Sequence, residues 1–117
     1  MARQRQADDF LPLTAVVFEI LLALASGERH GYAIMQEVER RTEGRLSLHP
    51  GTLYRAISRM VKTGLIEELD ERPDETDRRR RYYRISQLGR GVARAEGWRL
   101  ASQVRAAQAK SLLPETA

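Results

Sequence analysis

Apolar residues in the first half of the chain recur three and four positions apart, which is the spacing of one face of an α-helix. They predict three successive helices, at about residues 13–26, 30–42 and 50–63. The first and third helices have a proline near their start, and a glycine follows the end of all three. These are common start and stop signals of helices. The spacing then shortens to two, which predicts a strand at 65–69 and a returning strand at 82–86.

A long final helix is expected to begin after an N-cap at Ser86 and to continue to about Leu112. Three compact helices, a two-stranded hairpin and a long helix therefore follow one another. This order is typical of the winged helix-turn-helix, a mainly α, α+β fold with a three-helix core and a two-stranded wing.

Composition limits the kinds of protein that this chain could be. Its 117 residues suffice for one modest domain, and without cysteine there is no disulfide framework and no thiolate nucleophile. His30 and His49 have no companion ligands, so we expect no metal site, and His30 is expected to cap the second helix. No phosphate-binding glycine motif or catalytic triad is present, so we expect no enzyme and no cofactor. No export signal or membrane span is visible, which favours a cytoplasmic protein.

Charge is distributed in blocks along the chain, although the net charge is only +4. Residues 44–66 contain four basic side chains and no acidic one, whereas residues 67–77 contain seven acidic side chains and one arginine. Residues 78–117 contain ten basic side chains and two acidic ones. Two basic blocks on either side of an acidic one indicate a directed electrostatic surface, for which nucleic acid is the leading partner and a membrane surface is a poor one.

The third predicted helix has two chemically different faces when its residues are placed at 100° intervals. One face is apolar and consists of Leu53, Ile57, Met60 and Val61. The other is polar and cationic without any acid, and consists of Thr52, Arg55, Ser58 on the flank, Arg59 and Lys62. Arginine can fork onto guanine, short hydroxyls reach base edges or backbone, and lysine neutralises phosphate. A solvated helix face usually mixes both signs, so this face favours binding of double-stranded DNA.

Four consecutive arginines, Arg78, Arg79, Arg80 and Arg81, lie at the predicted hairpin tip or on its returning arm. Such clustered charges are tolerated where DNA phosphates lie alongside, because each neutralised phosphate releases counterions. The alternative is that they pair with the acids of residues 67–77. We expect a mixed outcome in which two arginines contact phosphate and the others are structural. Strand alternation places one neighbouring tyrosine in the core and leaves the hydroxyl of the other, Tyr82, for phosphate.

The long final helix cannot bury itself in so small a domain, and its small residues permit close approach of a second copy of the chain. We therefore expect a homodimer. Trp98 is either an aromatic anchor in the dimer seam or one wall of a pocket for a flat aromatic effector between subunits. The expected dimerisation residues come from the first and last helices: Leu13, Val17, Phe18, Trp98, Leu100, Val104 and Leu112.

Five segments of the chain carry a family resemblance: HGYAI (30–34), PGTLYRAISRM (50–60), GLIE (64–67), DRRRRYYRIS (77–86) and LGR (88–90). Together they resemble the PadR family of bacterial transcriptional regulators. The resemblance covers roughly residues 13–110. It implies a dimeric winged-helix protein that binds inverted-repeat operators, usually as a repressor. It is closest to the short-form members, in which a single last helix swaps against the partner's first helix and the long effector domain of phenolic-acid sensors is missing.

The resemblance also implies DNA contacts by Tyr32, Thr52, Tyr54, Arg55 and Arg59. The helical wheel, however, places Tyr54 at the edge of the buried face, so we expect its ring to be mostly packed.

Two hypotheses for the function follow. The first is a homodimeric DNA-binding repressor with a flexible tail (1–10), a winged-helix DNA-binding domain (11–86) and a C-terminal dimerisation helix (87–113). The second is a winged-helix module that binds protein and not DNA, which the acidic block 67–77 and the long last helix leave open.

Overall fold

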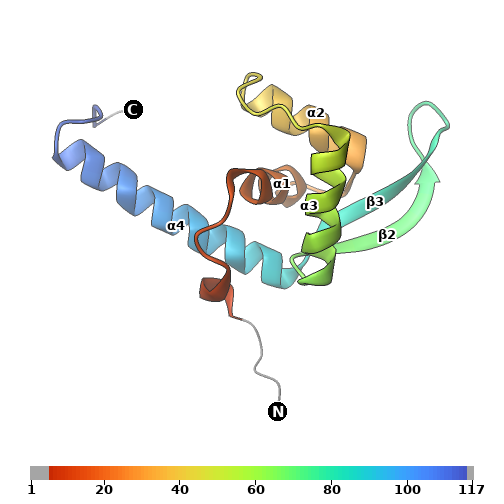
Figure 1. The fold of residues 1–117 in the computed structure, drawn as a ribbon, viewed down its shortest axis with the longest axis horizontal. Coiled ribbons are helices and arrows are strands. Elements are labelled where there is room, and N and C mark those ends of the chain that lie inside the picture. The colour runs from red at the N-terminus through yellow and green to blue at the C-terminus, as the bar shows by residue number, and fades with distance from the viewer. Residues whose placement is uncertain (1–5, 116–117) are drawn as a thin grey trace, which may run out of the picture.

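The structure is a computed structural model that describes residues 6–115. It has the winged helix-turn-helix fold predicted from the sequence, with helices α1 to α3 packed together and a β-wing extending from them (Figure 1). The elements in chain order are η1 (Ala7–Phe10), α1 (Ala15–Ala25), β1 (Arg29–His30), α2 (Gly31–Arg41), α3 (Pro50–Lys62), β2 (Ile66–Pro73), β3 (Arg79–Ile85) and α4 (Gln87–Ala109).

Helices α1, α2 and α4 begin at side-chain caps, which satisfy backbone N–H groups that have no partner within the helix, whereas α3 begins with Pro50 and has no side-chain cap. The Thr14 hydroxyl caps α1, and the His30 ring accepts a hydrogen bond from the N–H of Ala33 at 3.1 Å. The Ser86 hydroxyl accepts one from the N–H of Gly89 at 2.9 Å. The predicted caps at His30 and Ser86 are therefore confirmed.

The apolar faces of the helices meet in one core, which the inner ends of β2 and β3 join. Ile57 of α3 is 2% exposed, and the core extends through β3 to Val92 in the first half of α4. Because the spacing of the apolar residues matches the helical period, each helix buries one face and keeps the other in solvent. The most completely buried apolar residues are Ile20, Leu21, Leu24, Ile34, Val38, Leu53, Met60, Ile66 and Val92.

The sheet has three antiparallel strands in the order β1-β3-β2, where the sequence predicted two. The added strand, β1, pairs Arg29 with Tyr83 and His30 with Tyr82, and is too short to show an alternating pattern. Both wing strands are also longer than predicted, because β2 continues to Pro73 and β3 begins at Arg79. Their outer halves are almost wholly charged, so hydrophobic alternation could not reveal them.

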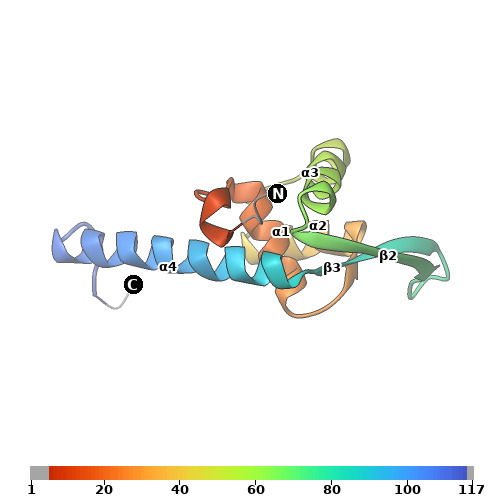
Figure 2. The same ribbon diagram turned by 90° about the horizontal axis from the view of Figure 1, so that it is seen from below.

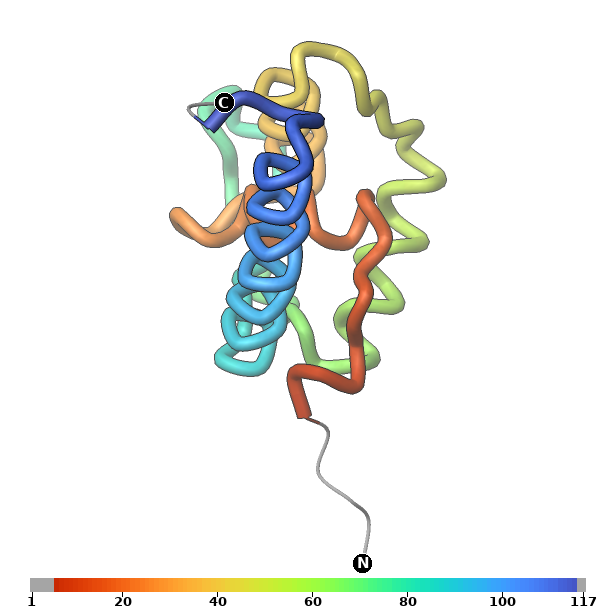
Figure 3. The backbone as a smooth tube through the Cα atoms, turned by 90° about the vertical axis from the view of Figure 1, so that its left-hand side faces the viewer, coloured from red at the N-terminus to blue at the C-terminus, as the bar shows by residue number. Residues whose placement is uncertain are grey.

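Part of the tail predicted at residues 1–10 has regular structure. Residues 7–10 form the 3-10 helix η1, which packs against α4. The following segment is held by a hydrogen bond of 2.8 Å from the N–H of Leu13 to the carboxylate of Glu96, which is 1% exposed. Figure 3 shows this segment in red passing beside α4. Residues 1–5 lie outside the described residues.

Helix α4 leaves the helical core in the direction opposite to the wing (Figure 2). Its first half is anchored, because Gly89 lies so close to the carbonyl of Leu65 that a Cβ there would overlap the oxygen. Beyond Glu96 no α4 residue is buried, and the helix ends at Ala109, three residues before the predicted end. No helix in residues 6–115 is long and apolar enough to cross a membrane.

Candidate nucleic-acid interface

The two predicted faces of α3 are confirmed as one buried face and one exposed face. Leu53, Ile57 and Met60 are buried in the core. The opposite face is exposed and consists of Thr52, Arg55, Ser58, Arg59 and Lys62. Within the described part of the chain, none of the three cations on this face has an ion pair or a side-chain hydrogen bond. Their charges are therefore fully available to an external partner.

The prediction that Tyr54 is mostly packed is wrong, because 46% of this residue is exposed. Its ring lies over Gly31, where an added Cβ would approach the phenol oxygen to 2.5 Å. A side chain at position 31 would therefore require the Tyr54 ring to move. Tyr32 follows in the same turn of α2 and is 44% exposed, so both tyrosines implied by the family resemblance reach the surface.

Strand alternation separates the wing arginines onto two faces. Tyr83 is buried, and Arg79 and Arg81 share its side of β3, whereas Arg80 and Tyr82 lie on the other side. The predicted orientation of the two tyrosines is therefore confirmed. A hollow of about 210 Å³ connects the wing with α3 and the first turn of α2, and is lined by His30, Gly31, Tyr54, Arg79, Arg80, Arg81 and Tyr83.

Some wing arginines pair with acids of β2, as the alternative interpretation of the sequence required. Arg81 lies 3.3 Å from Glu71 and 3.7 Å from Glu68, and Arg84 lies 3.1 Å from Glu67. All these side chains are between 45% and 50% exposed, so the pairs are solvated and weak.

Arg78 and Arg79 differ from Arg81, because neither guanidinium has a carboxylate partner among the described residues. The Arg79 guanidinium donates only to the backbone carbonyl of Glu71, at 2.9 Å. Of the four consecutive arginines, two guanidiniums therefore have no acidic partner among the described residues, and the other two, those of Arg80 and Arg81, each have one. This division is compatible with the expectation that two of the arginines contact phosphate and the others are structural. Whether the unpaired two contact phosphate stays a prediction.

Asp74 organises the turn between β2 and β3. One of its carboxylate oxygens accepts hydrogen bonds from the N–H and hydroxyl of Thr76 and from the N–H of Arg78, at 2.7–3.1 Å. The other accepts from Nε of Arg80 at 2.6 Å. The bonds from Thr76, followed by that from Arg80, hold the pKa of Asp74 well below its usual value. The sequence offered a signal for this turn, since an aspartate that bonds the backbone two residues ahead is a common turn former.

A stack of side chains supports the face of the wing that carries Tyr82. The edge of the His30 ring contacts the Tyr82 ring, with centroids 5.4 Å apart, and the Arg72 guanidinium lies 4.4 Å from the Tyr82 centroid. Arg72 also pairs with Glu28 at 2.6 Å. Burial, and then the positive charge of Arg80, lower the pKa of His30. Tyr82 is therefore half-buried, and its predicted contact with phosphate stays a prediction.

The predicted dimerisation residues occupy two kinds of position in the single chain. Trp98, Val104 and Leu112 on or just after α4 are 67%, 42% and 76% exposed. The others are partly buried, namely Leu13, Val17, Phe18 and Leu100. Neither the seam nor the effector pocket predicted at Trp98 is tested by one chain, and both stay predictions.

These surfaces define a winged helix-turn-helix protein with an acid-free cationic face on α3 and a wing whose returning strand is rich in arginine. The chain belongs to the transcriptional regulator PadR-like family, whose model matches residues 20–95. The family expected from the sequence motifs is therefore confirmed.

Known relatives agree with this assignment. A transcriptional regulator from Clostridium thermocellum is 33% identical, with a TM-score of 0.62 over 76% of this chain and 84% of its own. An uncharacterised protein X from Lysinibacillus sphaericus is 36% identical over 61% of this chain, and the match spans 64% of that relative, which is less than two thirds. Bacillus subtilis PadR in complex with operator DNA shares the fold, at 19% identity and a TM-score of 0.57 over 66% of this chain and 43% of its own.

Proposed function

We propose that the chain is a homodimeric, sequence-specific DNA-binding repressor that acts at an inverted-repeat operator in the cytoplasm. In this proposal α3 enters the major groove and the wing lies against the neighbouring backbone. The observation that carries it is the exposed face of α3, where Arg55, Arg59 and Lys62 form no ion pair with any acid of residues 6–115.

The chemistry of this face suits base recognition as well as phosphate binding. Arg55 and Arg59 are four residues apart, so they project from the same side of α3 one turn after the other. A guanidinium offers two parallel donors to the O6 and N7 acceptors of guanine. Thr52 lies one turn before Arg55 and supplies a short hydroxyl for a base edge or a phosphate.

The wing would supply affinity that does not depend on sequence. Arg78 and Arg79 carry charges that no acid neutralises in residues 6–115, and each phosphate that they contact releases condensed counterions. Binding through the wing should therefore weaken steeply with salt on every DNA sequence. α3 would add the discrimination between sequences.

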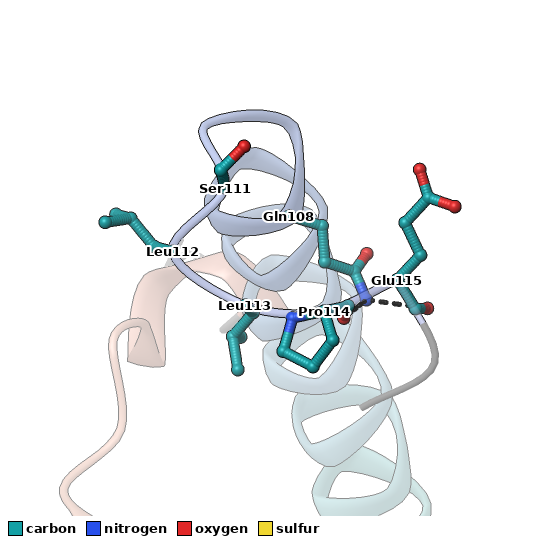
Figure 4. A pocket seen from close by; sticks show the side chains of 6 residues that line it. All are labelled: Gln108, Ser111, Leu112, Leu113, Pro114 and Glu115. Atoms are coloured by element: carbon teal, nitrogen blue, oxygen red, sulfur yellow. Dashed lines mark hydrogen bonds between the residues drawn. The ribbon is translucent and has the colours of Figure 1, made fainter.

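Dimerisation is supported by the apolar surface that α4 leaves uncovered. Trp98 and Val104 are exposed, and they follow Glu96, the last buried residue of α4. Figure 2 shows this helix extending away from the other helices. After α4 the chain turns back, and the Gln108 amide donates to the carbonyls of Pro114 and Glu115 at 3.2 and 3.1 Å (Figure 4). This turn forms a shallow hollow of about 360 Å³ and leaves Leu112 pointing away from the helix. A twofold dimer would present two copies of α3 to two half-sites in inverted orientation.

Selection of bound genomic fragments by the purified protein tests the proposal. We expect enrichment of fragments that share an inverted repeat, with binding that falls steeply between about 50 and 200 mM salt. Transcription from an enriched promoter should then fall when the protein is added. Absence of enrichment, together with a flat salt response, would contradict DNA binding and favour the protein-interaction module.

Sedimentation of a charged variant tests the dimer separately. Val104→Asp places a carboxylate on the uncovered surface of α4 and should yield monomers that bind one half-site weakly. Gln103→Asp adds the same charge at an exposed polar position next to it and serves as the control. A Val104→Asp protein that sediments like the wild type would exclude this surface as the seam.

A further inference from the structure

One ion pair of the wing differs from all the others in its burial. The Arg80 and Asp74 side chains are 21% and 9% exposed, whereas the pairs formed by Arg81 and Arg84 are between 45% and 50% exposed. Solvated pairs exchange partners easily because each contributes little to stability. The pair between Arg80 and Asp74 is shielded, so the Arg80 guanidinium is much less free to turn toward an external phosphate.

Asp74 is itself fixed by the turn that it closes. Three donors from Thr76 and Arg78 hold one carboxylate oxygen, and the N–H of Asp74 donates to the carbonyl of Arg78 at 2.8 Å. Its second oxygen is aimed at Nε of Arg80. The carboxylate therefore holds the guanidinium at a defined position above the wing.

The other side of Arg80 faces helix α2. Its guanidinium carbon lies 5.1 Å from the centroid of the Tyr32 ring, within the range of a cation–π contact. Tyr32 belongs to the first turn of α2, which packs on α3 through the contact of Gly31 with Tyr54. Arg80 thus connects the tip of the wing to the helix that supports α3.

We propose that Asp74, Arg80 and Tyr32 form a clasp that fixes the wing relative to α2 and α3, and that Arg80 is a positioning residue, not a phosphate ligand. The inference rests on the proposed DNA binding. A duplex must be contacted by α3 and by the wing at once, so a wing that is already held at the right angle loses less conformational freedom on binding.

The clasp and simple electrostatics predict opposite changes in DNA affinity when the carboxylate of the clasp is removed. Removal of a carboxylate near a DNA-binding surface should tighten binding to the polyanion. Asp74→Asn removes that charge but weakens the hold on Arg80, so the clasp predicts binding about tenfold weaker. Glu75→Gln is the matched control, since this adjacent exposed residue has no ion pair within residues 6–115, and its loss should leave binding equal or slightly tighter.

A charge-conserving change separates positioning from phosphate contact. Arg80→Lys keeps the positive charge but lacks the planar fork that both bonds Asp74 and lies over Tyr32. We expect it to bind about as weakly as Arg80→Ala, with an unchanged dependence on salt. Arg79→Lys should instead retain most of the affinity, because a phosphate accepts either cation.

Measurement of the affinity of these variants for the selected operator decides the matter, with thermal unfolding to verify that each variant is folded. Weaker binding by both Asp74→Asn and Arg80→Lys, with wild-type salt dependence, supports the clasp. If Asp74→Asn does not fold, Arg80→Lys alone decides. Binding at wild-type strength or tighter by a folded variant of either kind overturns the clasp and leaves the proposed function intact. Failure of the wild type to bind any DNA overturns both.

Discussion

The exposed face of α3 and the wing are both rich in arginine, but their arginines are held differently. Arg55 and Arg59 on α3 have no partner in the described chain, whereas on the wing Arg80 is held by Asp74 and Arg81 is shared between two glutamates. If the proposed function holds, the number of cations in a segment is therefore a poor guide to its capacity to bind DNA. What matters is whether binding must first break an internal interaction.

The same contrast separates two kinds of recognition. A free arginine on a rigid helix can add contacts to bases without losing any. An arginine on a salt-bridged strand exchanges a carboxylate for a phosphate, and its net contribution is correspondingly small. In the proposed function α3 would therefore discriminate between sequences, and the wing would contact the DNA backbone with a strength that its own acids moderate.

The largest expected effect is on stability and concerns the buried face of α3. Ile57→Ala removes a buried side chain beneath the reading face and should lower the free energy of unfolding by about 2–5 kcal/mol. Ser58→Ala, one residue along on the exposed side, should change it by less than about 0.5 kcal/mol. Chemical denaturation measures both values. Similar costs at the two positions would mean that the buried and exposed faces are wrongly assigned.

Arg79→Ala should produce the next largest effect. Loss of one free wing cation should weaken binding to operator and random DNA alike, and should reduce the slope of log affinity against log salt by about 0.9. Titration of both DNAs at several salt concentrations measures the change. A loss confined to the operator would instead make Arg79 a reader of sequence.

Glu71→Gln should act in the opposite direction and more weakly. It removes one of the two carboxylates beside Arg81, so binding to every sequence should tighten by no more than about 1 kcal/mol. Glu39→Gln, an exposed acid on α2, controls for net charge. Equal effects of the two substitutions would show that Glu71 does not compete with phosphate for the Arg81 guanidinium.

The smallest expected effect is a dependence of stability on pH through His30. Because its folded-state pKa lies below the unfolded value of 6.5, the unfolded chain takes up the proton first as the pH falls. The neutral ring therefore contributes its full stability above pH 6.5 and loses it below. His30→Asn keeps a good N-cap without titration, so its stability should vary less between pH 7.5 and 5.5. His49→Asn is the control. If stability varies with pH identically in His30→Asn and in the wild type, His30 is not the source of the pH dependence.

The sequence predicted the helices and the α3 face because each depends on local periodicity. Leu53 and Ile57 mark the buried side of α3, and the cations follow on the other side by helical geometry alone. The caps at His30 and Ser86 were predictable for the same reason, since the chemistry of a cap lies within a few residues of the helix that it begins.

The contacts that the sequence did not reveal join distant segments. β1 exists only because β3 lies beside it, and the hydrogen bond from Leu13 to Glu96 crosses most of the chain. The exposure of Tyr54 was predicted wrongly because a helical wheel contains only residues of the same helix. The Tyr54 ring lies at the surface against Gly31, which belongs to α2. Which arginine meets which acid in the wing likewise depends on strand register, which composition does not specify.

The ratio of operator affinity to random-DNA affinity tests the central claim most directly. The account predicts that Arg55→Ala and Arg59→Ala each lower this ratio, at a cost of about 1–3 kcal/mol on the operator. Arg78→Ala and Arg79→Ala should weaken both DNAs and leave the ratio unchanged. An unchanged ratio in both α3 variants, or a ratio lowered only by the wing variants, would contradict the assignment of α3 as the helix that reads the sequence.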